Sequence, residues 1–113
     1  MLQAVLDLAG AHGFLVLSDE SYDRFVYDGA AFTSMAGLPG DSAIVVRSLS
    51  KSHALANWRI GYVVASPDLV DAFTKVLEWD CLHCGYVQQR VAEAALTGPQ
   101  EWLAAIPERY QAN

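Results

Sequence analysis

The sequence predicts an α/β protein, in which helices alternate with fully buried strands. Short apolar runs lie at residues 14–17, 43–46 and 60–65, and segments of helical period precede and follow them. Runs of this length, bounded by polar or glycine-rich segments, are typical of strands buried on both faces. Only about a dozen residues separate the second and third runs, which is near the minimum for a parallel crossover. We therefore expect the third strand to run antiparallel to the second.

Composition excludes several classes of protein. The 113 residues are 53% hydrophobic and 18% charged, which fits one small folded domain and not a disordered chain. A formal charge of −6 lacks the basic surface that nucleic acid requires, so we expect no nucleic-acid partner. No apolar run is long enough to span a membrane, and the first residues do not resemble a secretory signal. The expected location is cytoplasmic.

The first helix is predicted at the start of the chain. Its apolar stripe has the i, i+3, i+4, i+7 spacing, and Gly13 stands where a helix would end. The stripe consists of Leu2, Val5, Leu6 and Ala9. This spacing predicts a helix that begins at residue 1 or 2 and ends at Gly13.

Three further helical segments are predicted after the third strand. Ser66 is placed as an N-cap with Pro67 in the first turn, and an apolar stripe then continues through Trp79. Residues 87–95 carry another stripe, which ends at residues 97–99. The final segment has helical spacing but contains Pro107, so we expect a kink or break at Ile106.

Polar residues gather directly after the first two predicted strands, at residues 18–22 and 48–51. In an open α/β sheet, ligands bind outside the carboxyl ends of the strands. The two clusters, together with Arg59, supply an amine, a guanidinium, hydroxyls, a phenol and a carboxylate. These are Asp19, Tyr22, Ser48, Ser50, Lys51 and Arg59.

These groups suit one kind of cofactor. The Lys51 amine can form a Schiff base once burial or a neighbouring cation lowers its pKa, and Arg59 supplies such a cation. Arg59 also matches a phosphate in bidentate fashion, with hydroxyls from Ser48 or Ser50 beside it. A carboxylate such as Asp19 would stay ionised opposite a protonated ring nitrogen. Together they describe a site for pyridoxal 5'-phosphate, abbreviated PLP, and no metal.

The motifs resemble those of the class I/II aminotransferases, which are PLP-dependent enzymes of fold type I. The resemblance extends from residue 1 to about residue 105, in the family's order and spacing. Its motifs are Ser18-Asp19-Glu20-Ser21-Tyr22, Tyr27-Asp28-Gly29, Ser48-Leu49-Ser50-Lys51 and Trp58-Arg59-Ile60-Gly61-Tyr62. The resemblance implies a mostly parallel three-layer αβα sheet, of which this chain is the second half of the large domain.

The same resemblance implies a role for each residue. Lys51 is the aldimine lysine and the acid and base of the proton shift, and Asp19 pairs with the pyridinium nitrogen. Tyr22 hydrogen-bonds the ring oxygen, whereas Ser48 and Arg59 hold the phosphate. Ser50 is a second hydroxyl at this place, although the family's phosphate-binding hydroxyl corresponds to Ser48.

The chain also departs from the family pattern. Asn57 stands where the family usually has glycine, in a loop with unusual backbone angles that asparagine tolerates better than most residues. The family's upstream and downstream site motifs are absent. We therefore expect a fragment, with residues 1–98 forming part of the PLP-binding large domain and residues 99–113 leading toward a small domain. Alone it is expected to be inactive; the full-length parent is expected to be a homodimer.

The expected reaction transfers an amino group between an amino acid and a 2-oxo acid. Other fold-type-I PLP proteins use the same cofactor residues, so a carbon–sulfur lyase, a decarboxylase and a PLP-sensing regulator domain remain alternatives.

Cys81 and Cys84 have C-x-x-C spacing but no second ligand pair, so we expect buried thiols at a helix junction and not a metal or redox site. Trp79, Tyr86 and Trp102 are expected in the core or at dimer contacts, and His53 in loop packing.

Overall fold

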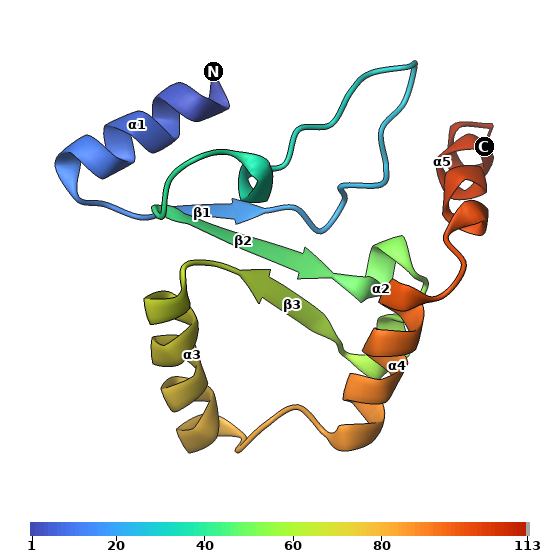
Figure 1. Ribbon diagram of the computed structural model, residues 1–113. Helices are drawn as coiled ribbons and strands as arrows, with labels where there is room; N and C mark the ends of the chain where they lie inside the picture. Colours follow the sequence, from blue (N-terminus) through green and yellow to red (C-terminus); the bar gives the residue numbers. More distant parts are fainter. Residues whose placement is uncertain (113) are drawn as a thin grey trace. The chain divides into compact units, whose positions relative to one another are not determined.

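The computed structural model describes residues 1–112, which contain α-helices, short 3₁₀ helices and one small sheet (Figure 1). The α-helices are α1 (Leu2–His12), α2 (Leu49–Ser52), α3 (Pro67–Asp80), α4 (Tyr86–Thr97) and α5 (Ala105–Gln111). The strands are β1 (Val16–Asp19), β2 (Ala43–Ser48) and β3 (Gly61–Val64). Short 3₁₀ helices are η1 (Met35–Gly37), η2 (Ala56–Trp58) and η3 (Glu101–Ala104).

The sheet has the strand order β1-β2-β3. Strands β1 and β2 are parallel, with Val16 opposite Ala43 and Asp19 opposite Val46. Strand β3 runs antiparallel to β2, as the short connection between them predicted (Figure 1). The α/β class and the mixed sheet predicted from the sequence are therefore confirmed.

The chain divides into two compact units that alternate along the sequence. The first unit consists of Met1–Glu20, Thr33–Arg47 and Tyr62–His83. The second consists of Ser21–Phe32, Ser48–Gly61 and the residues from Cys84 onward. The proposed domain boundary at residue 98 stays a prediction.

Helix α1 and strand β2 build the core of the first unit. Leu6 from α1, Met35 from η1 and Val45 from β2 are buried against one another. Gly13 ends α1 in the left-handed region, at φ 70°, and its N–H donates to the Ala9 carbonyl. The predicted extent of this helix is confirmed.

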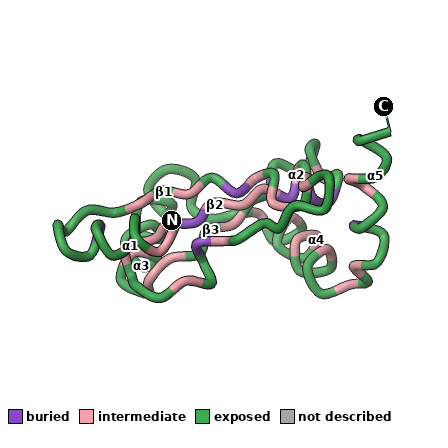
Figure 2. The backbone as a smooth tube through the Cα atoms, turned by 90° about the horizontal axis from the view of Figure 1, so that it is seen from above, coloured by how far each residue is buried: buried purple, intermediate pink, exposed green. Residues whose placement is uncertain are grey.

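The strands are less buried than their apolar sequences predicted. Residues along β1 alternate between half-buried and exposed, and Leu17 keeps 68% of its surface exposed. Figure 2 shows that exposed residues make up most of the chain. The expectation of strands buried on both faces is wrong for β1 and β3, which carry exposed residues, whereas every residue of β2 is buried or half-buried.

The helices after the sheet start and end close to the predicted residues, but their apolar stripes are not buried. Ser66 is the N-cap residue of α3 and Pro67 occupies its first turn, although the Ser66 side chain makes no capping bond. Neither α3 nor α4 contains a buried residue. Trp79 is 93% exposed, and Tyr86 and Trp102 are also exposed, so none of these three rings belongs to a core.

Helix α5 continues through Ile106 and Pro107 without a break. Pro107 is the third residue of α5, in the first turn, where a backbone N–H has no acceptor within the same helix, so proline removes no intrahelical hydrogen bond there. The change of helix type lies between Ala104, the last residue of η3, and Ala105, the first residue of α5. The predicted break at Ile106 is therefore wrong.

The two cysteines lie in the connection between α3 and α4. Both are exposed, so the expectation that they are buried is wrong. Among residues 1–112, no three histidine, cysteine or acidic side chains come together as a metal site. Within the same range, no helix has the length and apolar character to cross a membrane.

Candidate active site

Two predicted site residues end the parallel strands. Asp19 is the last residue of β1 and its side chain is exposed. Ser48 is the last residue of β2 and also the N-cap of α2, where its Oγ accepts a hydrogen bond from the Ser50 N–H at 3.2 Å. Asp19 belongs to the first unit, and Ser48 to the second. How Asp19 faces the other site residues stays a prediction.

Lys51 is carried by the single turn of α2 in the second unit. Leu49, which precedes it by two residues, is 1% exposed and anchors the turn. The Leu49 N–H donates to the Ile60 carbonyl at 3.1 Å, which closes the loop containing Lys51 and Arg59. Lys51 itself is exposed. Buried apolar packing therefore holds the backbone while the amine stays accessible.

The Lys51 amine lies beside an aromatic wall. Its Nζ is 5.9 Å from the centroid of the Tyr22 ring, within the range of a cation–π contact. A cavity of about 480 Å³ adjoins both side chains and is otherwise lined by Phe25, Tyr27 and Tyr110. A second cavity of about 590 Å³ is also bordered by Lys51, with Ser50 on its wall. The amine thus opens onto space large enough for a small aromatic ligand.

Arg59 ends the η2 turn in a left-handed conformation, with φ 55°. Its Nη1 donates to the Ala56 carbonyl at 3.1 Å, and the side chain is exposed. The other left-handed residue of this loop is Ala54, also at φ 55°, whereas Asn57 has no positive φ. The unusual angles expected at Asn57 therefore occur at Ala54, three residues before it, and at Arg59, two residues after it, where they cost about 1 kcal/mol each.

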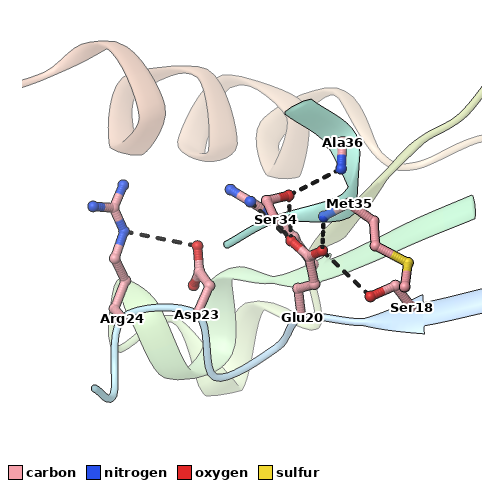
Figure 3. A network of polar contacts seen from close by, with 8 residues as sticks. Ser18, Glu20, Asp23, Arg24, Ser34, Met35 and Ala36 are labelled. Carbon is pink, nitrogen blue, oxygen red and sulfur yellow. Dashed lines mark hydrogen bonds and ion pairs between the residues drawn. The ribbon is translucent and has the colours of Figure 1, made fainter. Parts of the chain in front are cut away.

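A buried ion pair that the sequence interpretation missed lies directly after Asp19. The Glu20 side chain is 3% exposed, and Arg47 Nη2 donates to its Oε2 at 2.9 Å. The Ser34 hydroxyl donates to the same oxygen at 2.6 Å, and the Met35 N–H donates to Oε1 at 2.9 Å (Figure 3). Burial raises the pKa of this carboxyl group, but the hydrogen bonds and the charge of Arg47 outweigh burial, so the pKa lies below its ordinary value.

The sequence did carry a signal for this pair. Arg47 directly follows the four apolar residues of β2, and a charged residue that continues a buried strand indicates a buried partner. The Glu20 N–H also donates to the Val46 carbonyl at 2.9 Å, which extends the ladder beyond Asp19. The pair therefore fixes the backbone on which Asp19 is placed.

The second unit brings five of the six predicted residues onto two segments. Tyr22 and Lys51 share a cavity, and Ser48, Ser50 and Lys51 share one turn. Arg59 closes the same loop. An amine, two hydroxyls, a phenol and a guanidinium on one compact unit can hold an aldehyde that carries a phosphate.

The whole sequence, residues 1–113, matches the family described as Aminotransferase class I and II. The chain belongs to the class I and II aminotransferases. The predicted resemblance is confirmed by this match.

Individual relatives in this family point the same way. The chain is 35% identical over 113 residues to an aspartate aminotransferase of Geobacillus stearothermophilus, covering 97% of this chain and 29% of the relative. It is 35% identical over 111 residues to the glutamate-pyruvate aminotransferase AlaC of Escherichia coli strain K12, a match that covers 96% of this chain and 27% of that relative. The solved structure of an aspartate aminotransferase from Thermotoga maritima superimposes with a TM-score of 0.84 at 29% identity. The superposition covers 98% of this chain and 30% of that structure. This chain therefore spans under a third of the length of these aminotransferases.

Proposed function

We propose that this chain forms the lysine-bearing part of a PLP-dependent aminotransferase, which transfers an amino group between an amino acid and a 2-oxo acid. One observation carries the proposal: in a chain of this family, Lys51 presents an exposed amine to an aromatic-walled cavity. The named relatives differ in the amino acid on which they act, so the proposal stops at the class of substrate.

The residues present fit the cofactor. An exposed primary amine is the group that condenses with an aldehyde, and the cavity of about 480 Å³ beside it has an aromatic lining that suits a flat ring. The donors on the same unit suit a phosphate, because Arg59 offers a planar fork and Ser48 a hydroxyl. Bound PLP would supply the electron-withdrawing ring that makes the substrate Cα–H acidic.

The protein's side chains would have separate tasks. The Lys51 Nζ would hold the cofactor and then accept and return the Cα proton, a task that needs its neutral form. The phosphate would be bound by Arg59 and Ser48, with Ser50 as a second hydroxyl. Tyr22 would donate its phenol proton to the ring oxygen, and Asp19 would keep a proton on the ring nitrogen by remaining ionised. We place these residues in a homodimeric protein of the relatives' length.

The chain offers a direct test because it contains two lysines, Lys51 and Lys75. Lys75 is an exposed residue of α3 and serves as an internal control. The chain is incubated with PLP, reduced with borohydride and mapped by peptide mass spectrometry. We expect the adduct predominantly on Lys51, and Lys51→Arg should abolish that preference. Equal labelling of Lys51, Lys75 and the terminal amine would contradict the proposal.

A second test addresses the reaction. In a protein of the relatives' length that carries this sequence, Lys51→Ala should abolish transamination, whereas Lys75→Ala should leave it close to wild type. Amino-acid turnover that releases a thiol or carbon dioxide, with no amino-group transfer to the 2-oxo acid, would assign a different PLP reaction to the same residues.

A further inference from the structure

His53 directly follows the turn that carries Lys51, and it is a buried polar residue. The residue is 7% exposed, and its ring packs edge-on against Trp102 with centroids 6.0 Å apart. Nδ1 lies 2.8 Å from the Ser52 Oγ, whereas Nε2 is buried without a hydrogen-bond partner among the described residues. Burying a nitrogen without a partner costs free energy, so another interaction of the imidazole must offset this cost.

The hydrogen bonds around Ser52 determine which ring nitrogen carries the proton. The Ser52 Oγ donates to the Ser48 carbonyl at 3.1 Å. A hydroxyl has one proton, so the same Oγ can only accept from His53. Nδ1 is therefore the protonated nitrogen, and Nε2 of the neutral ring carries a lone pair.

These bonds form a short chain across the Lys51 turn. His53 Nδ1–H donates to Ser52, and Ser52 donates to the Ser48 carbonyl, so the chain spans the residues on both sides of Lys51. Backbone bonds close the same turn, since the N–H groups of His53 and Leu55 both donate to the Leu49 carbonyl, at 3.1 Å and 3.2 Å. The turn has only four helical residues, too few for helical propensity to hold it alone.

We propose that His53 is a positioning residue that acts through Ser52 to fix the turn carrying Lys51. An apolar ring such as phenylalanine would fill this space and pack against Trp102 without an orphaned nitrogen. What phenylalanine lacks is the Nδ1–H donor. The donor therefore accounts for the imidazole, and it orients the Ser52 hydroxyl toward the Ser48 carbonyl. The link to Lys51 rests on the proposed function, whereas the hydrogen-bond chain does not.

The first test reads the tautomer without any cofactor. The ¹⁵N-labelled 113-residue chain is examined by NMR above the pH at which its histidines are protonated, and the His53 signals are assigned by their loss in His53→Phe. We expect the proton on Nδ1. A proton on Nε2, which is the form that free histidine favours, would overturn the proposal, and so would the averaged signal of an unfolded loop.

The second test asks whether His53 acts through Ser52. Hydrogen exchange of the Leu55 amide is followed in His53→Phe, Ser52→Ala and the double variant, with the Val16 amide of the first unit as reference. Each single change should speed exchange about tenfold, the effect of losing one hydrogen bond, and the double change should add little more. His53→Asn, which keeps a donor near Nδ1, should stay close to wild type. Wild-type exchange in His53→Phe together with a loss in His53→Asn would show that His53 acts by packing alone. Additive losses, or a loss in His53→Asn as large as in His53→Phe, would also overturn the proposal.

The third test asks whether the hydrogen bond between His53 and Ser52 affects the reactivity of the Lys51 amine. The ratio of Lys51 to Lys75 labelling by PLP and borohydride should fall severalfold in His53→Phe and Ser52→Ala but not in His53→Asn. If the wild-type chain itself shows no preference for Lys51, the proposed function fails, while the tautomer and exchange results still decide the role of His53. A wild-type preference that survives in His53→Phe would overturn the positioning role alone.

Discussion

Arg47 Nη2 lies 2.9 Å from Glu20 Oε2, and this ion pair joins β2 to the residue that directly follows β1. The Glu20 side chain is 3% exposed, and Arg47 is 22% exposed. Hydrogen bonds from Ser34 and the Met35 amide satisfy the remaining carboxylate acceptors. A fully hydrogen-bonded carboxylate of this kind stabilises the fold only as long as it stays ionised and paired.

Neutralising this carboxylate should weaken the fold. Glu20→Gln removes the charge that pairs with Arg47 and disturbs the acceptor geometry, and we expect a loss of about 2 kcal/mol in the free energy of unfolding. Urea unfolding followed by circular dichroism measures it. Glu93→Gln is the matched control, because Glu93 pairs with Arg90 on the exposed surface of α4, and such pairs contribute under about 1 kcal/mol. Equal losses in the two variants would show that burial of the Glu20 pair contributes nothing.

The same group should make stability fall in acid. The pKa of Glu20 lies below its ordinary value in the folded chain, so the unfolded chain binds the proton more tightly. Its contribution is therefore complete above the unfolded pKa of about 4.3 and is lost as the pH falls through the folded pKa. Between about pH 6.5 and pH 3, the wild-type free energy of unfolding should decrease more than that of Glu20→Gln. Parallel pH curves for the two chains would contradict this assignment.

Local signals predicted the ends of elements well. Gly13 and Pro67 mark helix ends through their own backbone preferences, and both positions are where the sequence placed them. The antiparallel direction of β3 was predicted from the length of the connection alone, because about a dozen residues are near the minimum for a parallel crossover. Such signals depend on a few neighbouring residues, so one sequence suffices to find them.

Features that depend on distant segments were not predictable in this way. The apolar stripe of α3 and the run at Leu17 predict burial, but burial needs a covering layer, and residues 1–112 place none over them. The Glu20 site requires η1 to bring Ser34 and the Met35 amide to the end of β1, from 14 and 15 residues further along the chain. No local pattern encodes such an approach.

In the candidate site, too, some residues were predictable from local sequence and others were not. Spacing alone indicated Lys51, Ser48 and Arg59, because a strand end and a short loop place them on one turn. The side chains that support the turn were harder to identify, since nothing in the sequence around His53 predicts its bond to Ser52 or its packing against Trp102.

The glycine after α1 offers a test of backbone strain without side-chain clashes. Gly13 has φ 70°, and a Cβ at this position would meet no atom within 4 Å. Gly13→Ala should therefore cost about 1 kcal/mol through the left-handed backbone alone. Gly37→Ala is the control, because its Cβ would also meet nothing and its φ is not in that region. Thermal unfolding of both variants provides the measurement, and equal melting temperatures would contradict the expected strain.

Asp19 and Arg59 should contribute to different properties of bound PLP. Asp19 should matter mainly for its reactivity, and Arg59 mainly for its binding. In a protein of the relatives' length, Asp19→Ala removes the partner of the ring nitrogen but leaves the phosphate grip, so turnover should fall by about a hundredfold or more. The PLP dissociation constant should rise less in Asp19→Ala than in Arg59→Ala, because a bidentate guanidinium–phosphate contact provides much of the binding energy. Equilibrium dialysis of PLP and steady-state transamination give the two quantities. Asp71→Ala on the exposed face of α3 serves as control. Equal loss of PLP in Asp19→Ala and Arg59→Ala would overturn the division of roles between them.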